Sequence, residues 1–353
     1  MEKDTCLPCD LGIVIVNYNT SALLRDCLDS VFAAQSGLRM AVCVVDNASA
    51  DDSVAMSCQE FPQVHVIANH QNVGYPRANN QGLRWLGFCE PGQGGHPGSR
   101  QGATPPRFAL LLNPDTVLPP SALCEMLAFM EARSQAGVAG PKLVRLDGSL
   151  DRACRRSFPT PATSLYHLVR LDRLFPRSSR FGRYDLTYLD PDVLTQVDAV
   201  VGAFMLVRRE AIAGAGLLDE TFFMYGEDLD WSKRIKDCGW QVWYNPAVTV
   251  LHIKEAASRH SYRARREFYR ALILFYEKHY RSTTPLWLDW SIRGGVAFFG
   301  GLDLLSRRLR ARLMRAQEAP GARVAGGIAG LLIMVSAAAA LLGSGVLRCL
   351  HGG

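Results

Sequence analysis

Residues 108–115 read Phe-Ala-Leu-Leu-Leu-Asn-Pro-Asp, an apolar run that ends in a carboxamide and a carboxylate. The run has the length and composition of a buried β-strand. In an open α/β sheet, ligands bind beyond the carboxyl ends of the strands, which is where Asn113 and Asp115 would lie. An aspartate in that place can hold a divalent cation that neutralises a diphosphate. The alternative is a plain turn, because Asn, Pro and Asp all favour turns for local reasons.

The rest of the chain supports an α/β fold with a mostly parallel central sheet. Short apolar runs alternate with amphipathic segments from Leu11 onward, the pattern of βαβ units. Further strands are expected at 11–18, 40–45, 63–68, 137–144, 195–208 and 240–252, with helices at 21–34, 50–61, 78–88 and 121–133. An acidic helix is expected between the last two strands.

Length and composition predict a catalytic domain with an appendage. The 353 residues exceed the size of one ordinary domain. We expect a tail at 1–10, a catalytic domain at 11–262 with an inserted Gly/Pro-rich loop at 91–106, an amphipathic helical region at 263–323 and an apolar segment at 324–347. The net charge of +6 is too small to indicate a nucleic-acid partner.

The carboxyl-terminal part indicates a membrane surface. Residues 324–347 carry no charge and are long enough to cross a bilayer. Six arginines precede or begin this segment, which is typical of a cytoplasmic membrane face (Arg307, Arg308, Arg310, Arg312, Arg315 and Arg323). The chain starts without an apolar signal core, so we expect the catalytic domain at the cytoplasmic face of the inner membrane, peripheral or single-pass. A packed soluble helix hairpin is the alternative for 324–347.

Two strand ends are candidates for binding a nucleobase. The first strand ends in Tyr18 and Asn19, and the second in Asp46 and Asn47. An aromatic ring can stack on a base while a carboxylate accepts a hydrogen bond from an imino N–H. Taken singly, Tyr18 could be a core aromatic and Asp46 a helix cap.

The turn after the third strand is a candidate for binding phosphate. Asn72, Gly74, Arg77 and Asn80 lead into a helix, whose backbone N–H groups could meet phosphate oxygens together with the Arg77 guanidinium. Gly74 permits a tight turn. Arg77 could instead lie on a solvated helix face.

Acidic residues at 227–230 are candidates for proton transfer. Glu227, Asp228 and Asp230 begin a helix beside Trp231, where the helix dipole favours ionised carboxylates. An ionised aspartate beside an apolar wall could take a proton from a sugar hydroxyl. His252 follows another apolar strand and could share a metal ion with Asp115. The acidic cluster could also be a purely structural helix start, and the histidine a structural residue.

Assembled in this order, the motifs resemble those of the inverting family 2 glycosyltransferases of GT-A fold, rhamnosyltransferase-like branch. The resemblance runs from about Leu11 to Tyr280. It implies that Asp115 and His252 hold Mg²⁺ or Mn²⁺, with Asn113 as the weaker member of the metal motif, and that Asp228 is the catalytic base. It also implies a nucleotide-sugar donor and a saccharide or lipid-linked saccharide acceptor.

Three other classes of protein fit the sequence less well. A membrane-tethered nucleotide-sugar binding subunit without turnover would keep Tyr18 and Asp46, but the intact acidic cluster argues against it. A nucleotidyltransferase would carry a Gly-rich, basic phosphate loop near the first strand. A dinucleotide-binding oxidoreductase would carry G-x-G-x-x-G there. The sequence after Val16 has neither loop.

Overall fold

The computed structural model describes residues 9–89, 104–168, 171–253 and 262–318. The chain divides into two compact units, residues 1–255 and 256–353. The inserted loop expected at 91–106 lies almost wholly outside the described residues, as does the apolar segment 324–347.

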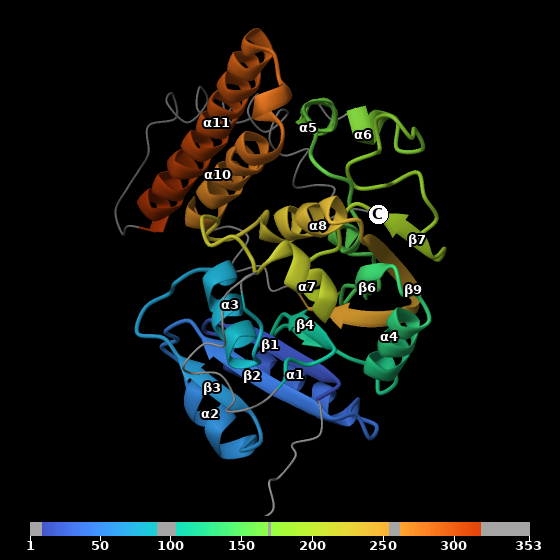
Figure 1. The fold of residues 1–353 in the computed structure, drawn as a ribbon. Coiled ribbons are helices and arrows are strands. Elements are labelled where there is room, and N and C mark those ends of the chain that lie inside the picture. Colours follow the sequence, from blue (N-terminus) through green and yellow to red (C-terminus); the bar gives the residue numbers. More distant parts are fainter. Residues whose placement is uncertain (1–8, 90–103, 169–170, 254–261, 319–353) are drawn as a thin grey trace, which may run out of the picture. The chain divides into compact units, whose positions relative to one another are not determined.

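The first unit is built on one mixed sheet (Figure 1). Its described strands are β1 (Leu11–Asn17), β2 (Met40–Asp46), β3 (His65–Ala68), β4 (Phe108–Leu112), β5 (Thr116–Val117), β6 (Ala136–Val144), β7 (Thr195–Val197), β8 (Phe204–Arg208) and β9 (Gln241–His252). They lie in the order β3-β2-β1-β4-β8-β6-β9-β5, with β7 paired to β9. Strands β1, β2, β3, β4, β6 and β9 run in one direction, and β5, β7 and β8 run against them. The expected α/β class with a mostly parallel sheet is confirmed.

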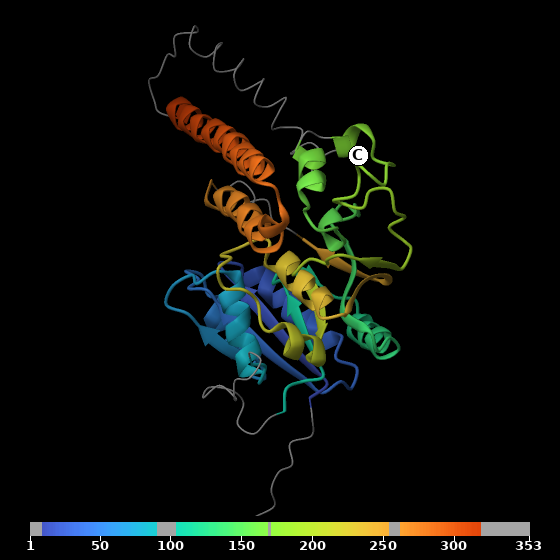
Figure 2. The ribbon, with the colours of Figure 1, turned by 45° about the horizontal axis from the view of Figure 1, so that its top comes forward.

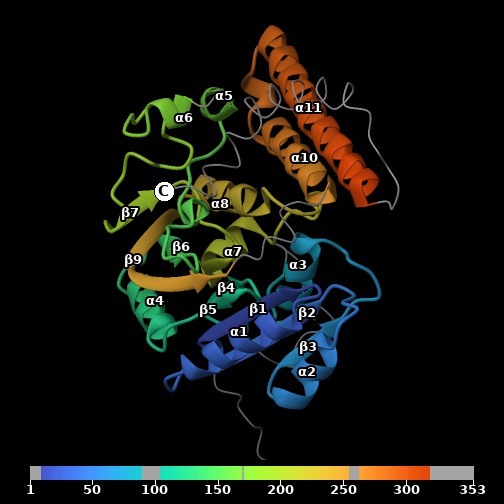
Figure 3. The same cartoon turned by 180° about the vertical axis from the view of Figure 1, so that it is seen from behind.

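Helices cover both faces of this sheet. They are α1 (Ser21–Ala33), α2 (Ser53–Glu60), α3 (Tyr75–Trp85), α4 (Ala122–Glu131), α7 (Arg209–Ala215) and α8 (Glu227–Asp237). The unit also contains the helices α5 (Pro161–Leu168) and α6 (Leu171–Leu174), which contact each other, and a 3-10 turn η1 (Arg152–Cys154). Helices α3, α7 and α8 lie on one face (Figure 1), and α1, α2 and α4 on the other (Figure 3). Because β4 is covered on both sides, all five of its residues are buried, which explains its unbroken apolar run.

The expectation of a single strand at 195–208 was wrong. The structure has two strands, β7 and β8, which pair with different neighbours. Between them the chain leaves the sheet, and Ala199 pairs with Arg156 instead. The apolar composition runs on through 199–207, so the sequence gives no sign of this change of partner.

Two helices begin at residues other than those expected. The helix expected at 78–88 begins at Tyr75, with Pro76 in its first turn, where proline's missing N–H has no cost. The helix expected at 50–61 begins only at Ser53. The expected acidic helix is α8, which begins at Glu227. Helix α7, which precedes it and is ended by Gly216 with a φ of 75°, was not predicted.

The described part of the second unit is a helical pair. Helix α10 (Tyr262–His279) and helix α11 (Leu286–Glu318) lie side by side (Figure 2), joined through the 3-10 turn η2 (Arg281–Thr283). Among the residues that the structure describes, no helix is both long enough and apolar enough to cross a membrane.

Candidate active site

The predicted residues at the strand ends meet at one edge of the sheet. Asn17 pairs with Asp46 in the β1–β2 register, and Ile15 pairs with Leu112, so the chain beyond β4 lies next to the end of β1. Strand β9 ends at His252, which pairs with Thr116. The backbone N–H of Ile253 also donates to the Asp115 carbonyl at 2.8 Å.

Asp115 and His252 form a close polar pair. The Asp115 Oδ1 lies 3.3 Å from His252 Nε2. The other ring nitrogen, Nδ1, lies 2.8 Å from Asp151 Oδ2, so the ring is held from both sides. Burial lowers the pKa of His252, but its hydrogen bonds with the two carboxylates outweigh that effect and raise it. Asp151, which comes from the turn after β6, was not predicted, because no motif marks its position.

This donor set suits a magnesium or manganese ion. One carboxylate oxygen and one imidazole nitrogen point at each other, and Asp151 orients the ring as outer-shell carboxylates do in metal sites. Within the described ranges, no group of three or more His, Cys, Asp or Glu side chains is arranged to hold a metal ion. Mg²⁺ typically uses one or two protein ligands and takes its remaining ligands from water and substrate phosphates.

Asp46 lies in a tight polar cluster at the end of β2. It is buried and accepts hydrogen bonds from Asn17 Nδ2 (2.9 Å), the Ser49 N–H (2.8 Å) and Ser49 Oγ (2.6 Å). Tyr18 follows with half of its side chain exposed, available for stacking. Asn19 has a left-handed backbone (φ 55°), and its Oδ1 accepts from the Ala50 N–H at 2.6 Å. Asn17 and Ser49, which fix the Asp46 carboxylate, were not predicted.

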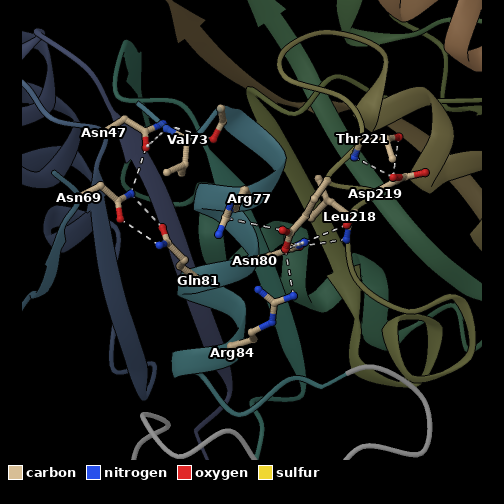
Figure 4. Close-up of polar contacts among 12 residues, drawn as sticks. Asn47, Asn69, Val73, Arg77, Asn80, Gln81, Arg84, Leu218, Asp219 and Thr221 are labelled. Atoms are coloured by element: carbon tan, nitrogen blue, oxygen red, sulfur yellow. Dashed lines mark hydrogen bonds and ion pairs between the residues drawn. The ribbon is translucent and has the colours of Figure 1, made fainter. Parts of the chain in front are cut away.

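Asn47 and Asn72 shape the turn that starts α3, and Figure 4 shows the contacts of Asn47 with Asn69 and Val73. The Asn47 Nδ2 donates to the Gly74 carbonyl at 3.3 Å, and its Oδ1 accepts from Asn69 at 3.1 Å. The Asn72 Oδ1 accepts from the Gly74 N–H at 3.0 Å. The side-chain contacts of both residues therefore hold Gly74 in place.

Four other predicted residues hold helices in place. The Asn80 amide donates to the Leu218 carbonyl at 2.8 Å and accepts from the Leu218 N–H at 3.0 Å, and Arg77 lies 3.8 Å from Glu220 (Figure 4). The other two lie on α8, where the fully buried Trp231 indole donates to the Gly216 carbonyl at 2.8 Å and Asp230 pairs with Arg234 at 2.9 Å. Asn80, Asp230 and Trp231 are buried in these contacts, whereas the Arg77 side chain stays 60% exposed.

Gly74 meets the backbone of another segment at close range. Its φ is 90°, and an added Cβ would lie 2.7 Å from the Phe223 carbonyl oxygen, the oxygen that accepts from the Tyr75 N–H. Alanine at this position would therefore carry both backbone strain and a clash with rigid backbone.

We expect Gly74→Ala to destabilise the protein by considerably more than Gly239→Ala. Gly239 has the same φ of 90°, but its Cβ would meet nothing within 4 Å. The control should cost about 1–2 kcal/mol of unfolding free energy from strain alone, and Gly74→Ala at least about twice that once the clash is added. Urea unfolding of both variants measures the difference. Equal losses would mean that the Phe223 contact relaxes freely.

Asp228 is buried at the start of α8 and is held by three donors. One oxygen accepts from the Arg156 guanidinium and from the Gly202 N–H at 3.3 Å, and the other from the Leu229 N–H at 2.8 Å. Burial disfavours the charge on Arg156, but the Asp228 carboxylate outweighs that effect and raises the pKa of the guanidinium. Three donors thus fix the Asp228 carboxylate at the start of α8, and a carboxylate is a group that can act as a general base.

Tyr75 joins the Asp228 side of the site to the end of β4. Its hydroxyl lies 3.0 Å from the Gly202 carbonyl and 3.3 Å from Asn113 Oδ1, while the Gly202 N–H reaches Asp228. Asn113 and the acidic helix start, 115 residues apart in sequence, thus belong to one polar cluster. Tyr75 lies in the segment predicted to bind phosphate, but no role was predicted for its hydroxyl. Arg156 was missed, because an arginine in an irregular segment carries no spacing signal.

Glu227 is the second buried carboxyl group of this cluster. Burial and the neighbouring Asp228 carboxylate raise its pKa from 4.5 to about 8, and its Oε2 has no hydrogen-bond partner among the described residues. Glu227 is therefore protonated at neutral pH.

The raised pKa of Glu227 predicts a pH-dependent stability. The contribution of neutral Glu227 to the free energy of unfolding is fully present below about pH 4.5. It is lost as the pH rises through 8, because the folded protein must then bury a charged carboxylate. Between pH 6 and pH 9 the unchanged protein should lose about 2–3 kcal/mol of unfolding free energy that Glu227→Gln does not lose. Urea unfolding at both pH values measures this, with Glu210→Gln at an exposed position as the control. Parallel losses in all three proteins would contradict the prediction.

The sequence matches a known protein family. The sequence model described as "Glycosyltransferase like family 2" matches residues 8–270. The chain belongs to this family. The assignment confirms the resemblance drawn from the motifs.

Relatives within the family agree. The chain is 28% identical to an N-acetylglucosaminyl-diphospho-decaprenol L-rhamnosyltransferase of Mycobacterium tuberculosis, over 87% of this chain and 98% of that one. It is 23% identical to a low-salt glycan biosynthesis hexosyltransferase of Haloferax volcanii, over 69% of this chain and 67% of that one.

A solved structure supports the fold. The structure of GalNAc-T7 with UDP, GalNAc and Mn²⁺ superposes with a TM-score of 0.50 at 15% identity. The match covers 77% of this chain and 48% of that one, so the chain spans about half the length of that protein. The likeness supports an α/β fold of GT-A type for this member of the family.

Proposed function

We propose that this glycosyltransferase transfers a deoxyhexosyl group from a nucleotide diphosphate sugar to a lipid-linked saccharide, with inversion at the anomeric carbon. The observation that carries the proposal is the polar cluster at one sheet edge. The Asp115–His252 pair lies two residues along the chain from Asn113, whose side chain contacts Tyr75, and both Tyr75 and Asp228 contact Gly202.

The residues of this edge have complementary roles in such a reaction. Tyr18 stacks on the base of the donor and Asp46 accepts a hydrogen bond from it. Asp115 and His252 would hold Mg²⁺ or Mn²⁺, and the bound ion would supply positive charge at the leaving diphosphate. Asp228 takes the proton of an acceptor hydroxyl, and the oxygen then attacks the anomeric carbon opposite the diphosphate.

The identities of donor and acceptor rest on the mycobacterial relative. That protein's name specifies an L-rhamnosyl group and N-acetylglucosaminyl-diphospho-decaprenol, and 98% of its length aligns with this chain. We therefore propose dTDP-rhamnose as the first donor to test, followed by UDP-sugars. A polyprenyl diphosphate saccharide is the first acceptor to test, and the proposed location is the cytoplasmic face of the membrane that carries it.

The test is transfer and donor hydrolysis by the purified chain. A panel of dTDP-, UDP- and GDP-sugars is incubated with Mn²⁺ or with EDTA, with and without a polyprenyl diphosphate N-acetylglucosamine in detergent, and released nucleoside diphosphate is measured. Release from one donor that depends on both metal and acceptor supports the proposal. Nucleotide binding without release under any condition would favour a catalytically silent binding subunit.

A further inference from the structure

Helix α11 packs through its polar face. Residues on this face contact α10, as Asp303 pairs with Arg265 at 2.6 Å and Arg293 with Glu277 at 2.7 Å. Asp289 accepts from the Tyr276 hydroxyl at 3.0 Å. The spacings 289, 293 and 303 place these side chains on one side of a helix with 3.6 residues per turn.

The opposite face of α11 is apolar and exposed. Trp287, Trp290 and Phe298 leave 71%, 76% and 62% of their surface open, and Leu302 and Leu305 continue the row. A Cβ added to Gly294 or Gly301, which lie on the same face, would meet nothing within 4 Å. A soluble helix normally buries its apolar side and exposes its charges, so α11 is inverted in this respect.

The positive charge of helices α10 and α11 favours an anionic partner for the exposed face of α11. Residues 262–318 contain twelve Lys or Arg and five Asp or Glu, a net charge of +7, whereas the whole chain carries +6. The positive charge of the protein is thus concentrated in α10 and α11. Two such surfaces would repel each other, which disfavours a second copy as the partner.

We infer that the exposed face of α11, defined by Trp287, Trp290, Phe298, Leu302 and Leu305, docks on an anionic lipid bilayer surface. Tryptophan is enriched at membrane interfaces, where its ring lies among the headgroups. The sequence of the last turns of α11 is rich in arginine, at 308, 310, 312 and 315, whereas Arg307 pairs with Asp303. Basic residues near the end of an amphipathic helix attract anionic lipids. The chain then continues into 324–347, which carries no charge.

Docking on a bilayer would serve the proposed function, and this benefit rests on that function. A lipid-linked acceptor stays at the membrane, so an enzyme held there meets it in two dimensions. Vesicle binding can be measured whether or not transfer is found, and the two proposals therefore fail separately.

The test uses the full chain and two kinds of vesicle. Vesicles of phosphatidylcholine with 30% phosphatidylglycerol should bind the protein, and pure phosphatidylcholine should bind it at least tenfold less. Brominated acyl chains should quench tryptophan fluorescence, and Trp287→Phe with Trp290→Phe should abolish most of that quenching. This second readout reports on α11 itself, even if residues 324–347 also enter the bilayer.

A charge-insertion variant completes the test. Trp287→Glu with Trp290→Glu should lower the partition coefficient at least tenfold, while Leu146→Glu with Leu174→Glu, at exposed apolar positions of the first unit, should leave it unchanged. Thermal unfolding should be unaltered in both, because the side chains are exposed. Equal vesicle binding by the α11 variant and the unchanged protein would overturn the inference. It would also be overturned if light scattering showed that the unchanged protein is a dimer and the α11 variant a monomer.

Discussion

Asp228→Asn should abolish glycosyl transfer while donor binding stays nearly intact. A positioned general base contributes about 10²–10⁴ in rate, and asparagine cannot accept a proton. We expect a loss of about 10³-fold in kcat with an unchanged donor Kd, because Tyr18 and the Asp115–His252 pair are left in place. Calorimetric titration with donor and a transfer assay separate the two quantities.

The Arg156 contact makes the stability control essential. Asparagine would leave the buried Arg156 guanidinium without its counter-charge, and breaking a buried ion pair from one side costs about 3–5 kcal/mol. If Asp228→Asn unfolds, Asp228→Asn with Arg156→Gln removes the orphaned charge and allows the same measurement. Asp237→Asn, at the exposed end of α8, is the matched control and should be fully active. Normal turnover of a folded Asp228→Asn protein would remove Asp228 from the mechanism.

Much of the fold was predictable because burial controls composition. The five residues of β4 are apolar since both faces of the strand are covered, and the alternation with amphipathic helices identified the parallel sheet. The change of partner between β7 and β8 was not predictable. Strand β8 is largely buried and β7 is buried only at Val197, yet the apolar composition runs on through 199–207. Which neighbour a strand pairs with depends on residues far away in sequence.

The same distinction holds within the site. Asp115, His252, Asp46 and Asp228 were predicted because the end of a strand or the start of a helix places a side chain at a known edge. Their partners come from irregular segments, where Asp151 orients His252 and Arg156 pairs with Asp228. No periodicity marks such positions. Conversely, Asn80 lies in a motif that the resemblance assigns to donor binding, yet its amide is engaged by the Leu218 backbone.

Asp115→Ala should abolish metal-dependent transfer and metal binding together. The carboxylate is the one anionic ligand of the proposed pair, and a divalent cation at the leaving diphosphate contributes several kcal/mol to transition-state stabilisation. We expect a rate loss of at least about 10²–10³-fold. Excess EDTA should produce a similar loss in the unchanged protein but little further loss in the variant. Titration with Mn²⁺ in the presence of nucleoside diphosphate, followed by electron paramagnetic resonance, gives the affinity directly.

Asp151→Asn tests whether His252 is held as a metal ligand. Asp151 touches the far side of the ring at 2.8 Å and would act only by orienting it, so metal affinity should fall about 10–100-fold. Raising the Mn²⁺ concentration should then restore the rate, which it cannot do for Asp115→Ala. Asp147→Asn, an exposed carboxylate in the same turn, is the matched control and should leave Mn²⁺ affinity unchanged. Full Mn²⁺ affinity in Asp151→Asn would mean that the Asp151–His252 contact supports only the fold. The His252 ring would then be oriented by packing, without help from the Asp151 carboxylate.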